Sequence, residues 1–311
     1  MKQDYRLSII ISTINRASIL KNLLEILFKQ ERVEDISFEI IVVDNGSTDN
    51  TASTVELFQK KSPNIKYLYE QRKSLSIARN IGASNASGAI LIFLDDDVEP
   101  RNDFVRQVAS SFESFSVDCV GGKITASWPK NEIPDWFSSK LCHVVGQTSF
   151  GENSRYFKKD EFPFGGNISI RRLIFKRLGG FSEYLGRAGG NFLTGEEIDL
   201  CYKIQKEGGK FYYNANAEVL HIVGEKRANK NYFLNSLFGK GITEGFQKRR
   251  HKGFVHYWVY FILKLFSLPI CFFISFVPVF NSNLKFQSRC SLNWCLGYIY
   301  FVFHPINKNC K

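Results

Sequence analysis

Three adjacent acids, Asp95, Asp96 and Asp97, are the residues whose types and spacing point most directly to chemistry. They follow the apolar run Ala89–Leu94, which predicts a buried strand. The first and third carboxylates of an extended triplet can face the same side. Mg²⁺ and Mn²⁺ are held by one or two such carboxylates together with substrate phosphates. The triplet therefore predicts a divalent-cation site, although a solvated acidic turn before a helix near Asn102 would also explain it.

The elements around the triplet predict where other polar groups will gather. Apolar runs predict strands, and apolar residues at helical spacing predict helices between them. The strands are expected at 7–12, 38–43, 65–69 and 89–94, and the helices at 15–30, from Asp49 through Phe58, and from Ser74 to about Asn85. This alternation indicates a parallel, doubly wound sheet, which binds ligands beyond the carboxyl ends of its strands. Ser12-Thr13 and Asp44–Ser47 lie at those ends with the triplet.

The pattern becomes irregular after Gly121, and residues 123–165 are expected to be mostly loops. A helix is predicted again at Leu200–Lys206, ended by Gly208-Gly209. Two short strands are expected at Lys210–Tyr213 and Glu218–His221.

The positive charge of the chain is concentrated in its C-terminal part. With 44% hydrophobic and 23% charged residues, the composition is that of a globular protein and excludes disorder. Of the net charge of +11, residues 226–311 hold 13 Lys and Arg against one acid, Glu244, so the preceding part is nearly neutral. A folded nucleic-acid-binding domain would carry basic residues on its body. A basic tail with apolar segments fits an anionic membrane surface better.

The tail holds a basic cluster, Lys248–Lys252, followed by the stretch Phe254–Phe280, whose only Asp, Glu, Lys or Arg is Lys264. This stretch is long enough to span a membrane, which takes about 20 apolar residues. Two prolines and Lys264 count against a span, and the shorter apolar run Leu292–Phe303 predicts an interfacial or re-entrant segment. The alternative is a pair of hydrophobic helices that packs on the body or on a partner.

The seven cysteines form no metal-type spacing. Their odd number, and an N-terminal apolar run, Leu7–Ser12, that is too short for a signal sequence, predict a reducing compartment and a cytosolic catalytic part.

Taken together and in order, several motifs resemble those of the family 2 glycosyltransferases with the GT-A fold. The resemblance covers about residues 5–240. It rests on Ser8–Ile14 with Asn15-Arg16, Ile41–Thr51 (IVVDNGSTDNT), Arg79-Asn80-x-Gly82, Leu94–Pro100 (LDDDVEP), Phe164–Arg171 (FGGNISIR) and Leu185–Leu200, which contains Thr194-Gly-Glu-Glu197.

The resemblance implies an α/β, Rossmann-like fold with a mostly parallel sheet, flanking helices and a C-terminal hydrophobic helical tail. The expected divisions are a catalytic domain at 1–240, a basic linker at 241–253 and a membrane-associating region at 254–311.

The resemblance also assigns roles to single residues. Donor binding would involve Thr13 and Asp44 at the nucleotide base, Arg79 at the diphosphate, Asp95 at the ribose or sugar, and the less clearly assigned Asp96. Asp97 would ligate Mn²⁺ or Mg²⁺, with Asp95 and His221 as further candidates. The acceptor side would hold Gly166, Asn167 and Trp136, although the tryptophan could equally pack in a loop or core.

Glu197, or else Glu196, is the candidate catalytic base, because inverting transfer needs a carboxylate that takes the proton of the acceptor hydroxyl. The common family form has Asp at the second of these positions. Thr194 and Glu197 also fit a capping box that would only begin a helix, and Asp199 would support that helix start.

The implied function is metal-dependent inverting transfer by a hexosyltransferase-type enzyme from a nucleotide-diphosphate donor, UDP-linked above all, to a glycan or lipid-linked acceptor. Such an enzyme suits surface polysaccharide assembly at the cytoplasmic face of the inner membrane. One alternative is a sugar nucleotidyltransferase, but Ser12–Ala17 lacks the glycine of its phosphate loop. Another is a membrane-tethered nucleic-acid-binding protein without enzyme activity, for which no binding signature is present.

Overall fold

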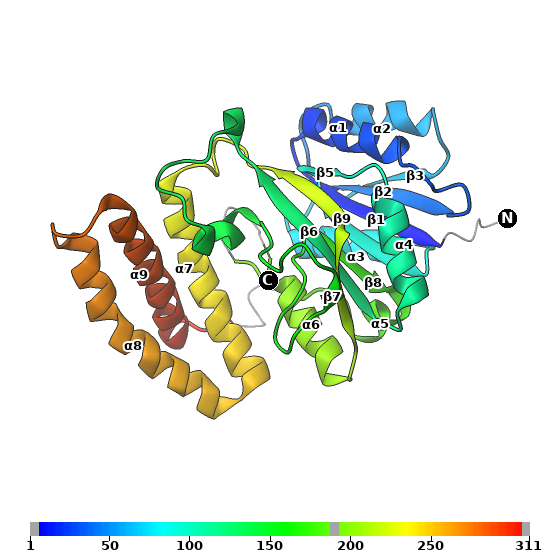
Figure 1. Cartoon of the computed structure of the whole chain (residues 1–311). Coiled ribbons are helices and arrows are strands. Elements are labelled where there is room, and N and C mark those ends of the chain that lie inside the picture. Colours follow the sequence, from blue (N-terminus) through cyan, green and yellow to red (C-terminus); the bar gives the residue numbers. More distant parts are fainter. Residues whose placement is uncertain (1–5, 187–192, 307–311) are drawn as a thin grey trace. The chain divides into compact units, whose positions relative to one another are not determined.

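The computed structural model describes residues 6–186 and 193–306 (Figure 1). Part of the predicted segment Leu185–Leu200, namely residues 187–192, lies outside the described residues, as do 1–5 and 307–311. The chain forms two units. The first comprises Met1–Ser127, Gly146–Glu183 and Glu196–Ile222, and the second comprises Trp128–Val145, Tyr184–Gly195 and Val223–Lys311. Helix α7 (Lys230–Gln247) runs across residue 240, and the domain boundaries expected from the sequence stay a prediction.

The strands of the first unit pair in one mixed sheet with the order β3-β2-β1-β4-β8-β6-β9-β5, with β7 paired to β9. Their bounds are β1 Leu7–Thr13, β2 Phe38–Asp44, β3 Ile65–Tyr69, β4 Ile90–Asp95, β5 Val98–Pro100, β6 Cys119–Ser127, β7 Arg155–Tyr156, β8 Asn167–Arg171 and β9 Phe211–Ile222. The first four strands are parallel, as the alternation of apolar runs and helical patterns predicts. β8 then pairs antiparallel with both β4 and β6.

The strand β9 is continuous where two short strands were expected, so that prediction was wrong. The side chain of Asn214 explains why the polar segment does not end the strand. Its Oδ1 accepts hydrogen bonds from the backbone N–H groups of Asn216 and Ala217, at 2.9 and 3.3 Å. The neighbouring strand β6 accommodates this segment of β9, because the register between the two strands shifts between Gly122 and Ile124. A Cβ at Gly122 would collide with the carbonyl of Ala217.

Helices cover both faces of the sheet because its strands are apolar on both sides. On one face, Leu7, Ile9 and Ile11 of β1 pack with apolar residues of α1 (Ala17–Phe28), α2 (Thr51–Gln59) and α4 (Phe104–Ser114). On the other, Ile10 packs with α3 (Leu75–Ser84), α5 (Arg172–Arg177) and α6 (Glu196–Lys206). This alternation along β1 follows from the two-residue period of a strand.

The second unit is helical. It contains the 3₁₀ segments η1 (Pro129–Asn131) and η2 (Ser139–Val145), helix α7, the π-helical turn η3 (Lys248–Lys252), α8 (Phe254–Phe276) and α9 (Ser282–Phe303). Glycines let α7 and α9 approach closely, since a Cβ at Gly241 would meet the carbonyl of Trp294 and one at Gly297 that of Phe238. The run Leu292–Phe303 does not form an element of its own, and its expected interfacial or re-entrant position stays a prediction. It is the C-terminal half of α9, with Cys295, Tyr298 and Phe301 buried.

Among the described helices, α8 is the one long and apolar enough to cross a membrane. Of the 18 most apolar consecutive residues of α8, only 6% are buried within the protein.

Candidate active site

The carboxyl ends of β1, β2 and β4 bring together the polar groups that the sequence places there. Thr13 is opposite Asp44 in the sheet register, and Ser12 is opposite Asp95. Both oxygens of the buried Asp44 are engaged: Oδ1 accepts from the N–H of Ser47, and Oδ2 accepts from the hydroxyl of Tyr67, each at 2.8 Å. The bond to Ser47 orders the turn after β2. Contact of Thr13 and Asp44 with a nucleotide base stays a prediction.

The second and third acids of the triplet are buried, and one guanidinium bridges them. Nη1 of Arg16 donates to Asp96 Oδ1 at 2.6 Å and to Asp97 Oδ2 at 2.9 Å. Both carboxylates are 5% exposed. The hydroxyl of Thr13 donates to the other oxygen of Asp96 at 2.7 Å. Burial raises the pKa of Asp96 to about 6, although the charge of Arg16 opposes this shift.

His221 lies beside Asp97 because β5 begins directly after the triplet and pairs with β9. Val98 is opposite His221 in that antiparallel pair. The Nε2 atom of His221 lies 3.3 Å from Asp97 Oδ1, and the imidazole is buried. The structure thus brings together two of the predicted metal ligands, which are 124 positions apart in the chain.

The donor set fits a divalent cation that completes its coordination with substrate oxygens. Asp97 offers a carboxylate, the ligand type that Mn²⁺ and Mg²⁺ take together with phosphate groups. His221 Nε2, 3.3 Å from Asp97 Oδ1, adds an imidazole, which binds transition-metal ions better than Mg²⁺. Within the part of the chain that the structure describes, no group of three or more His, Cys, Asp or Glu side chains is arranged to hold a metal by itself. Oδ1 of Asp95, the third candidate ligand, accepts a hydrogen bond from Arg79, and its role as a metal ligand stays a prediction.

Arg79 links the triplet to helix α6. Its side chain is 3% exposed, and it donates to Asp95 Oδ1 at 2.8 Å and to Glu196 Oε1 at 2.8 Å. It also donates to the carbonyl of Gly165 at 2.9 Å. The predicted contact of Arg79 with a diphosphate stays a prediction. What the structure establishes is that this arginine holds two predicted site carboxylates in place.

The glycines before β8 permit this close packing. A Cβ at Gly165 would lie 2.9 Å from Nη1 of Arg79, and one at Gly166 would lie 2.8 Å from Oδ2 of Asp95. The next residue, Asn167, is 1% exposed and donates to the carbonyls of Ala217 and Lys123, at 2.9 and 3.2 Å. Its amide thus ties β8 to β6 and β9, while the acceptor-side assignment of Gly166 and Asn167 stays a prediction.

Glu196 and Glu197 begin helix α6 but have different surroundings. Glu196 is buried in the ion pair with Arg79. Glu197 is partly exposed as a residue. Burial, and then the negative charge of Glu196, raise the pKa of Glu197 to about 8. Asp199 is fully buried, accepts from the hydroxyl of Ser182 and pairs with Lys203 at 3.0 Å, as expected for a residue that stabilises the helix start.

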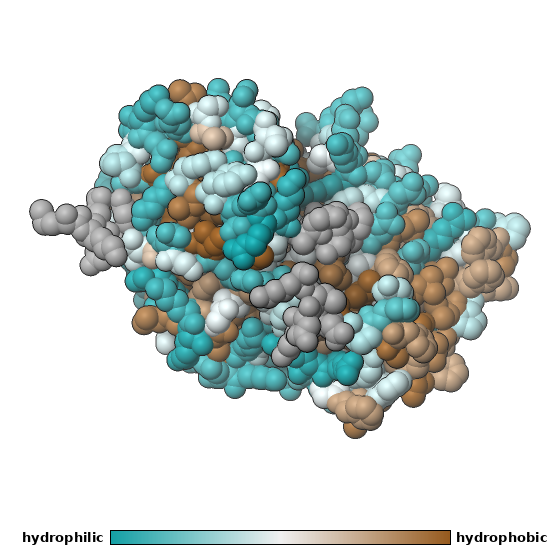
Figure 2. All heavy atoms as spheres, turned by 180° about the vertical axis from the view of Figure 1, so that it is seen from behind, coloured by the Kyte–Doolittle hydropathy of each residue, from teal (hydrophilic) through white to brown (hydrophobic). Residues whose placement is uncertain are grey.

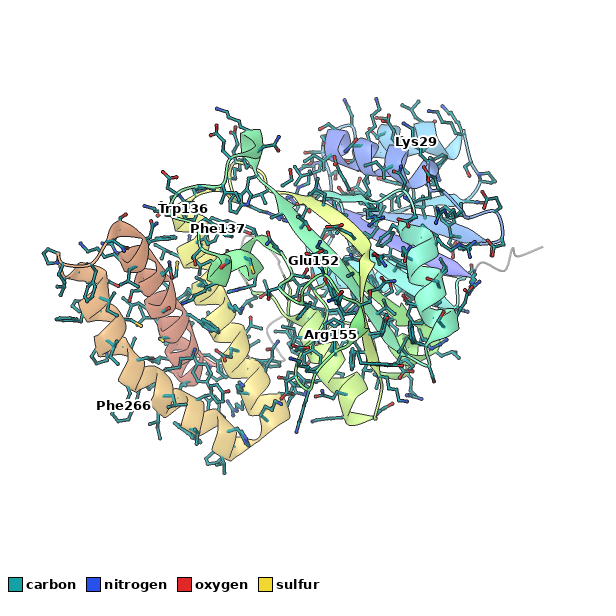
Figure 3. The ribbon with its side chains drawn as sticks, viewed as in Figure 1. Lys29, Trp136, Phe137, Glu152, Arg155 and Phe266 are labelled. Atoms are coloured by element: carbon teal, nitrogen blue, oxygen red, sulfur yellow. The ribbon has the colours of Figure 1, made fainter. Side chains whose placement is uncertain are left out.

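Trp136 belongs to the second unit, where its ring packs edge-on against Phe233 at 5.0 Å and Phe286 at 5.1 Å. Figure 3 shows Trp136 and its neighbour Phe137 beside the beginning of α7. This is the loop or core packing that the sequence left open, and an acceptor contact stays a prediction.

Two residues of the site were not among the candidates. Arg16 was noted only as part of the opening motif, although an arginine three residues after a strand-end threonine was a usable signal. Tyr67 lies in the middle of β3, and nothing in the sequence distinguishes it from a packing residue.

The fold is the GT-A fold of glycosyltransferases. The structure resembles the mannosyltransferase PcManGT of Pyrobaculum calidifontis, determined with GDP-Man and Mn²⁺, with a TM-score of 0.63 and 13% identity, covering 98% of this chain and 89% of that one. It also resembles S. aureus TarS with UDP, with a TM-score of 0.56 and 18% identity, covering 96% of this chain and 92% of that one.

The chain belongs to the glycosyl transferase family 2, whose profile matches residues 8–179. It is 23% identical over 210 residues to the glucosyl-dolichyl phosphate glucuronosyltransferase of Haloferax volcanii, covering 66% of each protein. It is 25% identical over 314 residues to the dolichyl N-acetyl-alpha-D-glucosaminyl phosphate 3-beta-D-2,3-diacetamido-2,3-dideoxy-beta-D-glucuronosyltransferase of Methanococcus voltae, covering 96% of this chain and 93% of that one. The protein is an enzyme of the hexosyltransferase type.

Proposed function

We propose that this glycosyltransferase is metal-dependent and moves a sugar, with inversion, from a nucleotide-diphosphate donor to a lipid-linked or glycan acceptor. The observation that carries the proposal is that one unit holds two groups of charged side chains and that a single arginine links them. Asp97, His221 and Arg16 form the first at the strand ends, and Glu196 and Glu197 form the second on α6. Arg79 connects them through Asp95.

The donor is proposed to be a UDP-sugar. The support is that one fold relative was determined with UDP and another with GDP-Man, so this fold accommodates nucleotide diphosphates. In this chain, Thr13 and Asp44 lie at the carboxyl ends of β1 and β2, which is where doubly wound sheets bind their ligands.

The metal would be held by Asp97 and His221. A bound Mn²⁺ or Mg²⁺ supplies positive charge toward the diphosphate as it leaves. The arginine beside these ligands, Arg16, contributes a fixed positive charge to the same place. Both carboxylates that it bridges are shielded from water, which strengthens such electrostatic effects.

Glu197 is proposed as the base that removes the proton of the acceptor hydroxyl. Its partial exposure leaves it within reach of an acceptor, and its raised pKa makes it a stronger base than an ordinary carboxylate. Glu196 is occupied by Arg79 and is therefore proposed to position this first turn of α6.

The acceptor is proposed to be lipid-linked, at the cytoplasmic face of a membrane, in the assembly of a surface glycan. The names of two relatives specify dolichyl phosphate-linked acceptors. The long apolar helix α8, which directly follows a basic turn, supports membrane association of this chain.

The proposal is tested with the full chain and a panel of nucleotide sugars. Released nucleoside diphosphate is measured with Mn²⁺, with Mg²⁺ and after chelation of both. We expect release that needs the metal and falls at least 100-fold in Asp97→Asn, because the positive charge of a metal beside the negatively charged leaving diphosphate contributes several kcal/mol. Glu34→Gln, a substitution of an exposed surface acid, serves as the matched control.

Full turnover of Asp97→Asn or of the chelated enzyme would contradict the metal assignment. Release of pyrophosphate from a nucleoside triphosphate and sugar phosphate would instead identify a nucleotidyltransferase.

A further inference from the structure

Helix α8 carries a continuous apolar face that residues 6–186 and 193–306 leave uncovered. Exposed side chains recur every three or four residues along it, as one face of a helix requires. They include Phe254, Trp258, Ile262, Phe266, Ile270 and Phe273, of which Phe266 is 73% exposed. Figure 2 shows hydrophobic side chains gathered over the C-terminal helices, and in Figure 3 Phe266 points away from α9. An apolar patch of this kind marks a surface that binds a partner or a membrane.

The one Lys or Arg of α8 is turned to the opposite side of the helix. Nζ of Lys264 lies 3.3 Å from Oε2 of Glu244 on α7 and 4.1 Å from the ring centroid of Trp294 on α9. Its side chain is only 16% exposed. Because the ion pair holds the charge inside the helical unit, the outer face of α8 presents no Lys, Arg, Asp or Glu.

The same packing argues against a span. Lys264 lies near the middle of α8, so the helix could cross a bilayer only with Lys264 kept in its ion pair with Glu244 inside a bundle of helices. If α8 crossed the membrane together with its neighbours, it would carry Glu244 of α7 and Lys285 and Arg289 of α9 toward the hydrocarbon. The glycine contacts between α7 and α9 and the hydrogen bond from Ser288 to the carbonyl of Cys271, at 3.0 Å, hold the three helices together.

A basic turn lies directly before the apolar face. The turn η3 (Lys248–Lys252) holds four Lys and Arg side chains and one His without an acid, and Arg249 is exposed. Cations next to an apolar helical face are the arrangement that binds to anionic lipid headgroups from one side. An apolar groove of about 700 Å³, lined by residues such as Phe272 of α8 and Leu296 of α9, extends this surface and would admit acyl chains.

We propose that α8 lies in the plane of one leaflet of an anionic bilayer, with its outer face among the acyl chains, and does not cross the membrane. The ion pair between Glu244 and Lys264 keeps the charge of α8 away from lipid in this position. The proposal rests on the membrane association proposed above and adds its geometry and lipid chemistry.

Binding is tested by flotation of the full chain with vesicles of phosphatidylcholine alone or with 30% phosphatidylglycerol. We expect binding to the mixed vesicles, at least tenfold weaker binding to neutral ones, and at least a tenfold loss in Phe266→Glu. The matched control is Leu173→Glu, which changes a residue that is 80% exposed on α5. Equal loss in both variants, or self-association of the chain without vesicle binding, would overturn the proposal.

The plane of α8 is tested with protease-cleavable tags at the two ends of the chain, in sealed inside-out membrane vesicles from expressing cells. An in-plane helix leaves both tags cleavable from the same side. Protection of the C-terminal tag alone would show a span and overturn the proposal. Neither measurement uses a sugar donor, so failure of the proposed glycosyl transfer would be seen separately, in the nucleoside diphosphate assay.

Discussion

At the scale of single residues, one arginine gives the two neighbouring glutamates of the site different surroundings. Arg79 forms a buried ion pair with Glu196, at 2.8 Å. Glu197 is partly buried beside that negative charge, and its pKa rises to about 8. Identical side chains at consecutive positions are thus suited to different roles, one to holding the helix start and one to proton transfer.

Exchanging each glutamate for glutamine should separate these roles. We expect Glu197→Gln to retain its folding stability and to lose about 10²- to 10⁴-fold in kcat, the usual contribution of a general base. Glu196→Gln should instead lower the free energy of unfolding by about 2–4 kcal/mol, because it weakens a buried ion pair of Arg79. Chemical denaturation and nucleoside diphosphate release measure the two effects. A stable, inactive Glu196→Gln protein beside an active Glu197→Gln protein would reverse the assignment.

The pH dependence of the reaction follows from the same group. A carboxyl whose pKa rises from 4.5 to about 8 is protonated at neutral pH and acts as a base only after it ionises. We therefore expect kcat/KM to increase about tenfold per pH unit below pH 8 and to level off above it. The profile is measured from pH 5.5 to 9.5 at saturating metal. A plateau that already begins at pH 5.5 would show that an ordinary carboxylate is the base.

At the scale of elements, glycines decide how closely helices and strands approach. The crossing of α7 and α9 depends on Gly241 and Gly297, at which a Cβ would meet backbone atoms of the other helix. Backbone cannot move aside as the end of a flexible side chain can. The position of α8, which packs on α9, depends in turn on this crossing.

Enlarging one of these glycines should loosen the helical unit. We expect Gly297→Val to lower the free energy of unfolding by about 1–3 kcal/mol, the usual cost of overpacking. Gly224→Val, at a position with no other atoms within 4 Å of the added Cβ, is the control and should change stability much less. Thermal and denaturant unfolding of both variants check the prediction. Equal stability of the two would mean that α7 and α9 do not meet as described.

At the scale of the whole molecule, charge and apolar surface are both concentrated in the C-terminal part. Residues 226–311 carry the entire positive excess, and the same segment holds the exposed face of α8. Electrostatic attraction is screened over about 8–10 Å at physiological salt, whereas apolar burial is not. The two contributions to membrane binding can therefore be separated by ionic strength.

Removing two cations should weaken membrane binding and its dependence on salt. We expect Arg249→Gln with Lys252→Gln to reduce the affinity for anionic vesicles about 10- to 30-fold at low salt, at about 1 kcal/mol per basic residue. The difference from the unmodified chain should shrink as NaCl rises from 0.05 to about 0.5 M, where screening is stronger. Vesicle sedimentation over a salt series measures it. A difference that persists undiminished at high salt would show that these cations act through packing.

The sequence by itself determined the parallel half of the sheet, its flanking helices and the polar groups at its strand ends. This was possible because buried strands and amphipathic helices have local periodicities, and because strand ends of a parallel sheet lie at one edge. Local pattern also located the acidic triplet, the glutamate pair and the apolar tail.

Only the tertiary structure decided which of these groups meet. The bridge of Arg16 to Asp96 and Asp97, the approach of His221 and the link of Arg79 to Glu196 join residues 80 to 124 positions apart. Tyr67 enters the site without any signal, and β9 stays one strand because the side chain of Asn214 satisfies backbone groups locally. The sequence likewise did not determine which acid pairs with Lys264. A helical pattern fixes the face of the helix on which a residue lies, but not its partner on another helix. These outcomes depend on contacts between distant segments, which local sequence periodicity does not encode.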